Sequence, residues 1–532
     1  MHPALDRRAF LAALTGVTLS AIGRGVETVA AAQGPVAETR TGRVRGVQGS
    51  VISFRGVPYG GLVEGPARFL PPAPAKPWTG IRDAVTPGPR AMQLPDKTLG
   101  GQNIFTSPIL GPYFSGGRSD AASTVEPQSE NCLVLNVLTP GLRGKLPVMV
   151  YIHGGGFTQG SAALTLISDR FVDEEQIVLV GINHRLNAFG YTYLGDLDPR
   201  YADSGNAGQL DLIAALTWVR DNIAAFGGDP ANVTVFGESG GGAKISCLLA
   251  MPSAKGLFHR AIIESGSARS VRTKEEAAQD ATRMLAALGL DRSQLAQLQT
   301  IPAASLLTAA RRAGPVVDGR SVPHQTWAGG APPESKGVPL LVGNCKDEAT
   351  LFSISDPELF SLDWTTLRAR EIKAGIPDDK ADALIGQYRT DYPHDSASDI
   401  YFRIAADRGA RRNAIAQAEG KLRLGDDVYM YNFAWDTPVQ GGKFRAFHTS
   451  ELPLAMRLVN YPKSDGLSRQ VAGAWAGFAR SGNPNHSGLP RWEKYSTARR
   501  STMVFDLNRT ALVDHPAQAE LALLEPYSSA ML

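Results

Sequence analysis

The chain has 532 residues, of which 43% are hydrophobic and 20% are charged, and its 54 basic and 51 acidic residues leave a formal net charge of +3. This balance is ordinary for a globular protein. It does not suggest that the protein binds nucleic acid or a membrane surface through a strongly basic face of its own. A chain of this length buries a large core, so no disulfide framework or structural metal is needed to hold it. The three cysteines, Cys132, Cys247 and Cys345, show no zinc-ligand spacing, and we expect buried thiols and no metal.

Residues 1–32 have the pattern of an export signal. Paired arginines, Arg7 and Arg8, precede a short apolar run, and small residues up to Ala32 offer a cleavage site. The run is shorter than the roughly 20 residues of a membrane-spanning helix. We therefore expect the twin-arginine export machinery as a partner, cleavage near Ala32, and a periplasmic or secreted protein without a stable membrane anchor. The alternative is a disordered basic tail.

The elements that follow indicate one α/β domain over residues 33–532. Glycine-punctuated alternation between residues 42 and 60 predicts small antiparallel strands, and residues 96–128, rich in Gly, Ser and Pro, predict a surface loop bordering a site. Further along, strand and helix patterns alternate. Strands are predicted in "CLVLNVLTP", "LPVMVYIHGGGF", "IVLVGINHRL", "NVTVFGES", "HRAIIESGSA", "VPLLVGNCKDE" and "DVYMYNFAW", and helices in 207–226, 273–313, 355–425 and 466–481. This alternation predicts a mostly parallel sheet covered by helices.

The stretch "FGESGGGAKI", residues 236–245, fits two kinds of site. A phosphate-binding P-loop requires G-x-x-x-x-G-K-[ST], but Ala243 follows Gly242, and Ile245 follows Lys244. A nucleophile elbow requires G-x-S-x-G between a strand and a helix, and Gly237 to Gly241 match it with Ser239 at the centre. The elbow is favoured, with Gly237 and Gly241 providing clearance and the Gly240 N–H directed at an oxyanion. Lys244 is then expected to be an ordinary helix residue.

A second glycine-rich motif lies at the end of an earlier strand. In "IHGGGF", residues 152–157, glycines let the backbone approach a substrate so that N–H groups stabilise a developing oxyanion. The alternative is a simple tight turn. The combination with the elbow favours the oxyanion hole.

A serine nucleophile also requires a base and an acid, in the order Ser, acid, His for this fold. Of the histidines after Ser239, only His448 lies in a loop after a long strand, where catalytic residues of such sheets are found. The candidate acids are Asp347 and Glu348, which both follow an apolar strand. Spacing alone does not choose between them.

With these motifs the chain resembles the type-B carboxylesterase and cholinesterase family of the α/β-hydrolase fold. The resemblance runs from about Gly42 to Asp506 and rests on "SENCLVLNV", "VFGESGGGAKIS" and "GNPNHSGLPRW", among others. It implies Ser239 as nucleophile, Glu348 as acid and His448 as base. It also implies Gly155, Gly156 and Gly240 as oxyanion donors, Ser265 as a supporting hydroxyl, and no cofactor.

The chain departs from the family pattern at two positions. Gly240 stands where the family usually has alanine, which keeps the N–H and suggests a looser turn. The position that pairs with the signature cysteine, Cys132, corresponds to Ala91, so we expect no such disulfide.

The predicted function is hydrolysis of small-molecule carboxylic esters through an acyl-enzyme on Ser239. The same triad acting on amides, carbamates or thioesters is the nearer alternative. A non-catalytic binding or adhesion protein is the more distant one.

Overall fold

The computed structural model describes residues 34–95, 107–116, 118, 126–458 and 461–527. The predicted export signal, residues 1–32, lies outside this part of the chain. Within it, no helix has both the length and the apolar character needed to cross a membrane.

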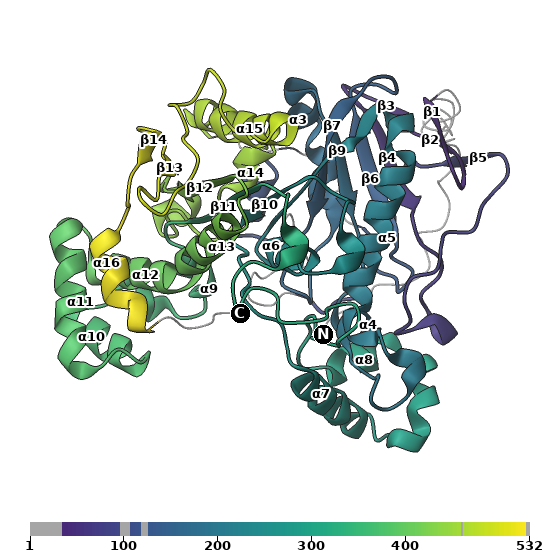
Figure 1. The fold of residues 1–532 in the computed structure, drawn as a ribbon, viewed down its shortest axis with the longest axis horizontal. Coiled ribbons are helices and arrows are strands. Elements are labelled where there is room, and N and C mark those ends of the chain that lie inside the picture. The colour runs from purple at the N-terminus through teal and green to yellow at the C-terminus, as the bar shows by residue number, and fades with distance from the viewer. Residues whose placement is uncertain (1–33, 96–106, 117, 119–125, 459–460, 528–532) are drawn as a thin grey trace, which may run out of the picture.

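An 11-stranded sheet forms the centre of the molecule (Figure 1). In order across the sheet, the strands are β14 Ala511–Val513, β13 Thr502–Phe505, β12 Val428–Phe433, β11 Leu340–Cys345, β10 Arg260–Glu264, β9 Gly228–Glu238, β7 Leu146–Ile152, β8 Val178–Ile182, β6 Val134–Thr139, β4 Ile52–Pro58 and β3 Val47–Gln48. The run from β13 to β8 is parallel throughout, whereas β14, β6, β4 and β3 pair antiparallel with their neighbours. The mostly parallel sheet predicted from the sequence is therefore confirmed.

A separate small sheet lies near the N-terminus of the described chain. Strand β2 (Gly42–Arg45) pairs antiparallel with β1 (Val36–Thr39) and parallel with β5 (Ile81–Asp83). The predicted antiparallel strands are present, and β5 adds one parallel pair that the sequence pattern did not indicate.

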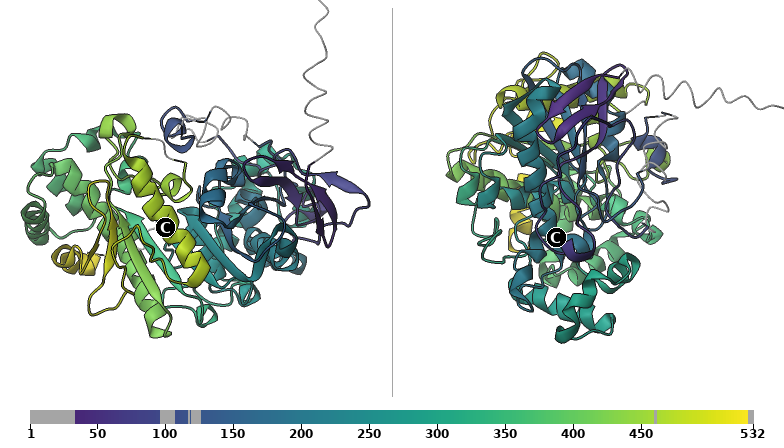
Figure 2. Two further views of the ribbon diagram at one scale, coloured as in Figure 1. Left: turned by 90° about the horizontal axis from the view of Figure 1, so that it is seen from above. Right: turned by 90° about the vertical axis from the view of Figure 1, so that its right-hand side faces the viewer.

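Helices cover both faces of the large sheet, as alternation along β7 illustrates. Val148, Val150 and Ile152 belong to one hydrophobic cluster, with residues of helices α5, α6 and α13, whereas Met149 and Tyr151 belong to another, with residues of α3 and α15. Successive side chains of a strand point to opposite faces, so these helix groups lie on opposite sides of the sheet (Figures 1 and 2). Their bounds are α3 Asp169–Glu175, α5 Ala207–Asn222, α6 Gly240–Leu248, α13 Arg412–Arg423 and α15 Ser464–Ser481.

Two groups of helices have hydrophobic clusters of their own. Helices α7 (Lys274–Ala287) and α8 (Ala303–Ala309) share one with α4 (Asn187–Tyr191). The other joins four helices that we call the rim bundle: α10 Trp364–Lys373, α11 Asp378–Asp391, α12 Ala397–Ala406 and α16 Gln518–Leu524. The rim bundle lies at one end of the molecule, and its α12 contacts the short helix α9 (Ala349–Phe352) (Figure 1).

The predicted surface loop over residues 96–128 is only partly described. Its described residues include a one-turn helix, α2 (Gly111–Phe114), preceded by the buried Leu110. A second short helix, α14 (Leu452–Ala455), follows the loop that carries His448. All three cysteines of the chain are buried and none is in a disulfide.

The topology brings the candidate residues to one edge of the sheet. Parallel strands place their carboxyl ends at the same edge, where ligands bind in open α/β sheets. His153 follows β7, Ser239 follows β9, Glu348 follows β11 and His448 follows β12.

Candidate active site

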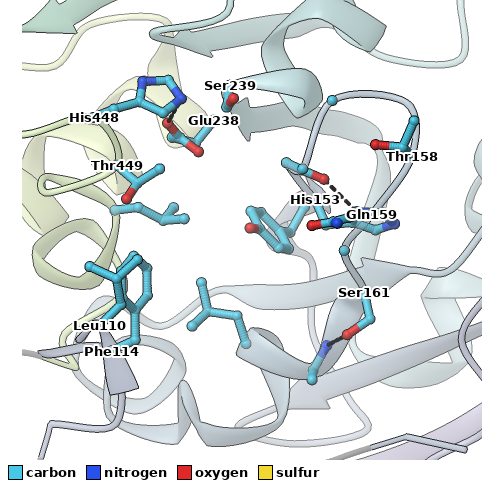
Figure 3. Close-up of a pocket in the computed structure, with 18 of the residues that line it drawn as sticks. Leu110, Phe114, His153, Thr158, Gln159, Ser161, Glu238, Ser239, His448 and Thr449 are labelled. Atoms are coloured by element: carbon cyan, nitrogen blue, oxygen red, sulfur yellow. Dashed lines mark hydrogen bonds and ion pairs between the residues drawn. The ribbon is translucent and has the colours of Figure 1, made fainter. Parts of the chain in front are cut away.

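Ser239 lies in a sharp turn between β9 and α6. Its φ of 56° and ψ of −123° place it in a region that residues with side chains rarely occupy. The turn is held by the Ser239 N–H, which donates to the Glu264 carbonyl of β10 at 2.8 Å. The side chain lines a cavity (Figure 3). This is the strained, projecting serine that the G-x-S-x-G motif predicts.

Two glycines beside Ser239 give clearance to a neighbouring strand. A Cβ at Gly237 would lie 2.5 Å from the Ile152 carbonyl oxygen of β7, and a Cβ at Gly241 would lie 2.0 Å from the same atom. Gly237 would also come within 2.9 Å of Gly241 itself. The two glycines therefore give clearance mainly to the end of β7, and Gly237 also gives clearance between strand β9 and helix α6.

His448 and Glu348 are in direct contact. His448 Nδ1 lies 2.5 Å from Glu348 Oε2, and the other carboxylate oxygen, Oε1, accepts from Ser265 Oγ at 2.6 Å and from Cys345 N–H at 2.8 Å. Asp347 points elsewhere, because its Oδ2 accepts from Ala446 N–H at 3.2 Å and lies 3.5 Å from Lys346 Nζ. Of the two candidate acids, the structure thus brings only Glu348 to the imidazole.

The other nitrogen of His448 faces Glu238, a residue that the sequence analysis did not single out. His448 Nε2 has no hydrogen-bond partner among the described residues and lies 3.3 Å from Glu238 Oε1. Ser239, Glu238 and His448 meet at one end of the cavity (Figure 3). Among the described residues, no hydrogen bond joins Ser239 to His448. Catalytic hydrogen bonds of this kind commonly tighten only when substrate is bound.

Further buried carboxylates lie behind the imidazole. Glu451 accepts from Tyr431 Oη and from Cys345 Sγ, each at 2.9 Å, and Glu264 is fully buried next to Ser265. Burial raises the pKa of Glu238, Glu264 and Glu451, and mutual repulsion adds to it. Sequence reasoning missed this group; the closeness of Glu451 to His448 in the chain was its only signal.

The carboxylates of Glu238 and Glu348 set the proton affinity of the candidate base, His448. Burial alone disfavours the charged imidazolium, but the negative charges of Glu238 and Glu348 outweigh it and raise the pKa of His448 to about 9. A general base acts in its neutral form. The fraction of neutral His448 therefore increases with pH through neutrality and reaches one half near pH 9.

A pH profile tests this electrostatic arrangement. We expect kcat/KM to rise with pH through neutrality, and Glu238→Gln to move that rise to lower pH by about one to two units, because an opposite charge is lost beside the imidazole. The measurement is kcat/KM for a small aryl ester between pH 5 and 10. Glu264→Gln is the control, since Glu264 is equally buried but is not among the groups that raise the pKa of His448 most. An unshifted profile in Glu238→Gln would contradict the inference that the negative charge of Glu238 raises the pKa of His448.

The candidate oxyanion hole combines α6 with the loop at the end of β7, residues 153–157, which we call the oxyanion loop. Gly155 and Gly156 have φ values of 80° and 60°, which glycine adopts without strain. Both line the cavity. Gly240 begins α6 directly after Ser239, so its N–H is an unsatisfied donor at a helix start.

The glycine at position 240 has a steric reason. A Cβ there would lie 2.3 Å from the Gly156 carbonyl oxygen and 2.5 Å from the Gly156 nitrogen. Backbone atoms cannot yield at such distances without moving the loop. Gly240 therefore allows a close approach of the oxyanion loop to α6, rather than the looser turn expected from the sequence.

Gly240→Ala is expected to displace Gly156 and to lower kcat by about 100-fold, the cost of losing one oxyanion donor. The measurement is kcat for an aryl ester, with the melting temperature recorded alongside. Gly386→Ala is the matched control, because Gly386 is an exposed residue of α11 with open space at its Cβ. Equal kcat in both variants would show that the close approach has no role in catalysis.

The cavity has a volume of about 460 Å³. Leu110, Phe114 and Leu164 form an apolar wall, and Phe352 lies over the His448 ring with 4.8 Å between centroids. Gln93 and Ser161 add polar groups. Across the described residues, no cluster of His, Cys, Asp and Glu has the arrangement of a metal site.

Comparisons with known proteins agree with this fold. The model of the carboxylesterase family matches residues 33–524. Para-nitrobenzyl esterase of Bacillus subtilis (strain 168) is 34% identical over 497 residues, which cover 88% of this chain and 94% of that protein. Liver carboxylesterase of Sus scrofa is 33% identical, with 87% and 88% of the two chains covered.

Solved structures give the same result. The crystal structure of the carboxylesterase EST55 of Geobacillus stearothermophilus at pH 6.2 matches with a TM-score of 0.77 and 34% identity, covering 92% of this chain and 99% of that one. The resemblance inferred from the motifs and the α/β-hydrolase fold are confirmed. The chain therefore belongs to the carboxylesterase family and is a carboxylic ester hydrolase.

Proposed function

We propose that the chain is an exported serine carboxylesterase in which Ser239 is the nucleophile, His448 the general base and acid, and Glu348 the residue that orients the imidazole. The observation that carries the proposal is the 2.5 Å contact between His448 Nδ1 and Glu348 Oε2, together with the position of His448 and the strained Ser239 at one end of the cavity (Figure 3).

The reaction proceeds by acyl transfer to serine and then to water. His448 Nε2 takes the proton of Ser239 Oγ as the Oγ–carbonyl carbon bond forms, and the oxyanion is stabilised by the N–H groups of Gly155, Gly156 and Gly240. The ester C–O bond breaks, and the alcohol leaves with the proton from His448. Water then attacks the acyl-enzyme, His448 takes its proton and returns it to Ser239 Oγ, and the carboxylic acid is released.

The cavity favours esters with an apolar group. Its wall of Leu110, Phe114 and Leu164 is apolar, whereas Arg90 and Glu238 line other parts of the cavity. Phe352, although 63% exposed, lines the same cavity and extends the apolar surface towards its mouth. Small aryl and alkyl esters are therefore the first substrates to test.

Covalent labelling tests the nucleophile. An organophosphate ester is expected to transfer one phosphoryl group to Ser239, detected by peptide mass spectrometry, with loss of hydrolysis in proportion to labelling. Hydrolysis that continues after complete labelling, or labelling confined to another residue, would reject the proposed mechanism.

A substrate pair tests the preference for esters. 4-Nitrophenyl acetate and 4-nitroacetanilide carry the same acyl and nitrophenyl groups and differ in the ester oxygen and amide nitrogen. The proposal expects rapid hydrolysis of the first and little of the second. Comparable rates would favour the alternative of amide hydrolysis.

Export is proposed from the paired Arg7 and Arg8 ahead of the apolar run. In bacteria that express the full chain, esterase activity is expected in the periplasm or medium, and replacement of both arginines by lysine is expected to retain it in the cytoplasm. Arg24→Lys, outside the pair, is the control. Unchanged distribution in the double variant would reject a twin-arginine signal.

A further inference from the structure

Lys244, which the sequence predicted to be an ordinary helix residue, is buried beneath the oxyanion loop. It lies on α6, five residues after Ser239, and is 0% exposed. Its Nζ donates to the backbone carbonyl of His153 at 2.9 Å. A buried ammonium group is unfavourable unless hydrogen bonds compensate for lost water, so this contact holds the lysine in a defined position.

Lys244 contacts both ends of the oxyanion loop. His153 is the first residue of the loop, and the ring centroid of Phe157, its last residue, lies 5.7 Å from Lys244 Nζ, within the range of a cation–π interaction. Between these ends lie three glycines, which have no side chains to anchor them. The Gly155 carbonyl accepts from the N–H groups of Thr158 and Gln159, and the position of Gly155 and Gly156 depends on this turn and on how the two ends are held.

The same lysine ties the loop to the helix that carries the third candidate donor. Gly240 and Lys244 are both residues of α6, whereas Gly155 and Gly156 belong to the oxyanion loop. The Lys244–His153 hydrogen bond thus joins the two separate parts of the oxyanion hole. It acts with the close packing of Gly240 on Gly156, a second contact between the same two parts.

The surroundings of Lys244 are basic rather than acidic. The rings of His153 and His184 stack with 4.6 Å between centroids, and both are buried. Burial, together with the positive charge of Lys244, holds the pKa of each imidazole well below its usual range, and burial lowers the pKa of Lys244 to about 7. Two neutral imidazoles therefore lie beside a lysine that is held by a neutral carbonyl acceptor.

We propose that Lys244 is a positioning residue of the oxyanion hole: from α6 it holds His153 and Phe157, so that the loop donors Gly155 and Gly156 stay aligned with Gly240. The inference rests on the proposed function, because it concerns stabilisation of the oxyanion formed on attack by Ser239. Lys244 touches neither substrate nor reacting atoms in this role.

The test is Lys244→Met, which keeps the length and apolar stem of the side chain and removes the donor. Misaligned donors weaken binding of the transition state more than that of the substrate. We expect kcat for 4-nitrophenyl acetate to fall by about 10- to 100-fold, less than or equal to the loss of one oxyanion donor. We expect KM to change by less than about threefold, and affinity for a trifluoromethyl ketone, which forms an oxyanion on Ser239, to fall with kcat.

Lys421→Met is the matched control. Lys421 is also 0% exposed and donates to a backbone carbonyl, that of Ser335. Unlike Lys244 it also forms an ion pair, with Asp426, and it lies on α13, outside the cavity lining. It is expected to lower the melting temperature without changing kcat per active site. Rates are normalised by organophosphate titration, so that a partly unfolded preparation does not count as a slow enzyme.

The outcomes separate the two proposals. If the parent enzyme is not labelled on Ser239, the proposed function fails. If it is labelled but Lys244→Met has the parental kcat and inhibitor affinity, the role of Lys244 alone is rejected. Should Lys244→Met not fold, Lys244→Leu, which also removes the donor, is measured for the same loss. Failure of both to fold while Lys421→Met folds would also reject the proposal, since Lys244 would then serve core stability only.

Discussion

Ser239→Ala is expected to lower kcat for a small aryl ester by about 10⁴-fold or more, because the variant has no oxygen to form the acyl-enzyme. Alanine retains the Cβ, so the turn at φ 56° suffers no new collision, and the Ser239 N–H bond to the Glu264 carbonyl is backbone to backbone. The melting temperature should therefore stay within a few degrees of the parent. The measurement is steady-state hydrolysis together with thermal unfolding.

Ser267→Ala controls for the loss of a buried hydroxyl near the same sheet edge. Ser267 is 6% exposed, and its Oγ has no hydrogen-bond partner within the described chain. Its replacement should leave kcat unchanged. Turnover by Ser239→Ala at more than about a hundredth of the parental rate would remove Ser239 from the mechanism.

Glu348→Gln is expected to lower kcat by about 10³- to 10⁴-fold, because the variant favours the wrong tautomer of His448. Oε1 of Glu348 accepts from Ser265 Oγ and from Cys345 N–H, and the backbone N–H cannot become an acceptor. The glutamine carbonyl must therefore occupy that place, which directs its NH₂ group at His448 Nδ1. An amide donor there favours the imidazole with its proton on Nε2, which cannot take the proton of Ser239.

Asp347→Asn is the matched control for Glu348→Gln. The two residues are adjacent and both buried, and asparagine keeps an oxygen that accepts from Ala446 N–H. Because Asp347 lies beside Lys346 and Arg445, the variant should lose stability, yet kcat should remain within about threefold of the parent. A large loss in Asp347→Asn with a small one in Glu348→Gln would exchange the roles of the two residues.

The sequence was sufficient for the fold and for the residues that lie in recognisable motifs. Hydrophobic periodicity and the strand–turn–helix around Ser239 predicted the parallel sheet because these signals are local. The choice between Asp347 and Glu348 depended on how the chain turns after β11, and spacing could not settle it. Only the family resemblance favoured the residue that the structure places beside His448.

The residues that were missed act through contacts between distant segments. Glu238 occupies the unspecified position of G-x-S-x-G, and its role depends on His448, 210 positions later by the numbering. Lys244 was predicted to be an ordinary helix residue, but every residue of α6 is buried because helices and strands surround it. Glycine is required at position 240 because a side chain there would collide with the Gly156 carbonyl of the oxyanion loop. No local sequence pattern reveals this contact.

The separate hydrophobic cluster of the rim bundle bears on how activity is lost on heating. Regions held by small clusters open at lower free energy than the central core. The rim bundle is such a region, and its α12 contacts α9, the helix that follows Glu348 directly. Loosening of these helices would release the acid from His448 while the large sheet is still intact, so we expect thermal inactivation to precede global unfolding.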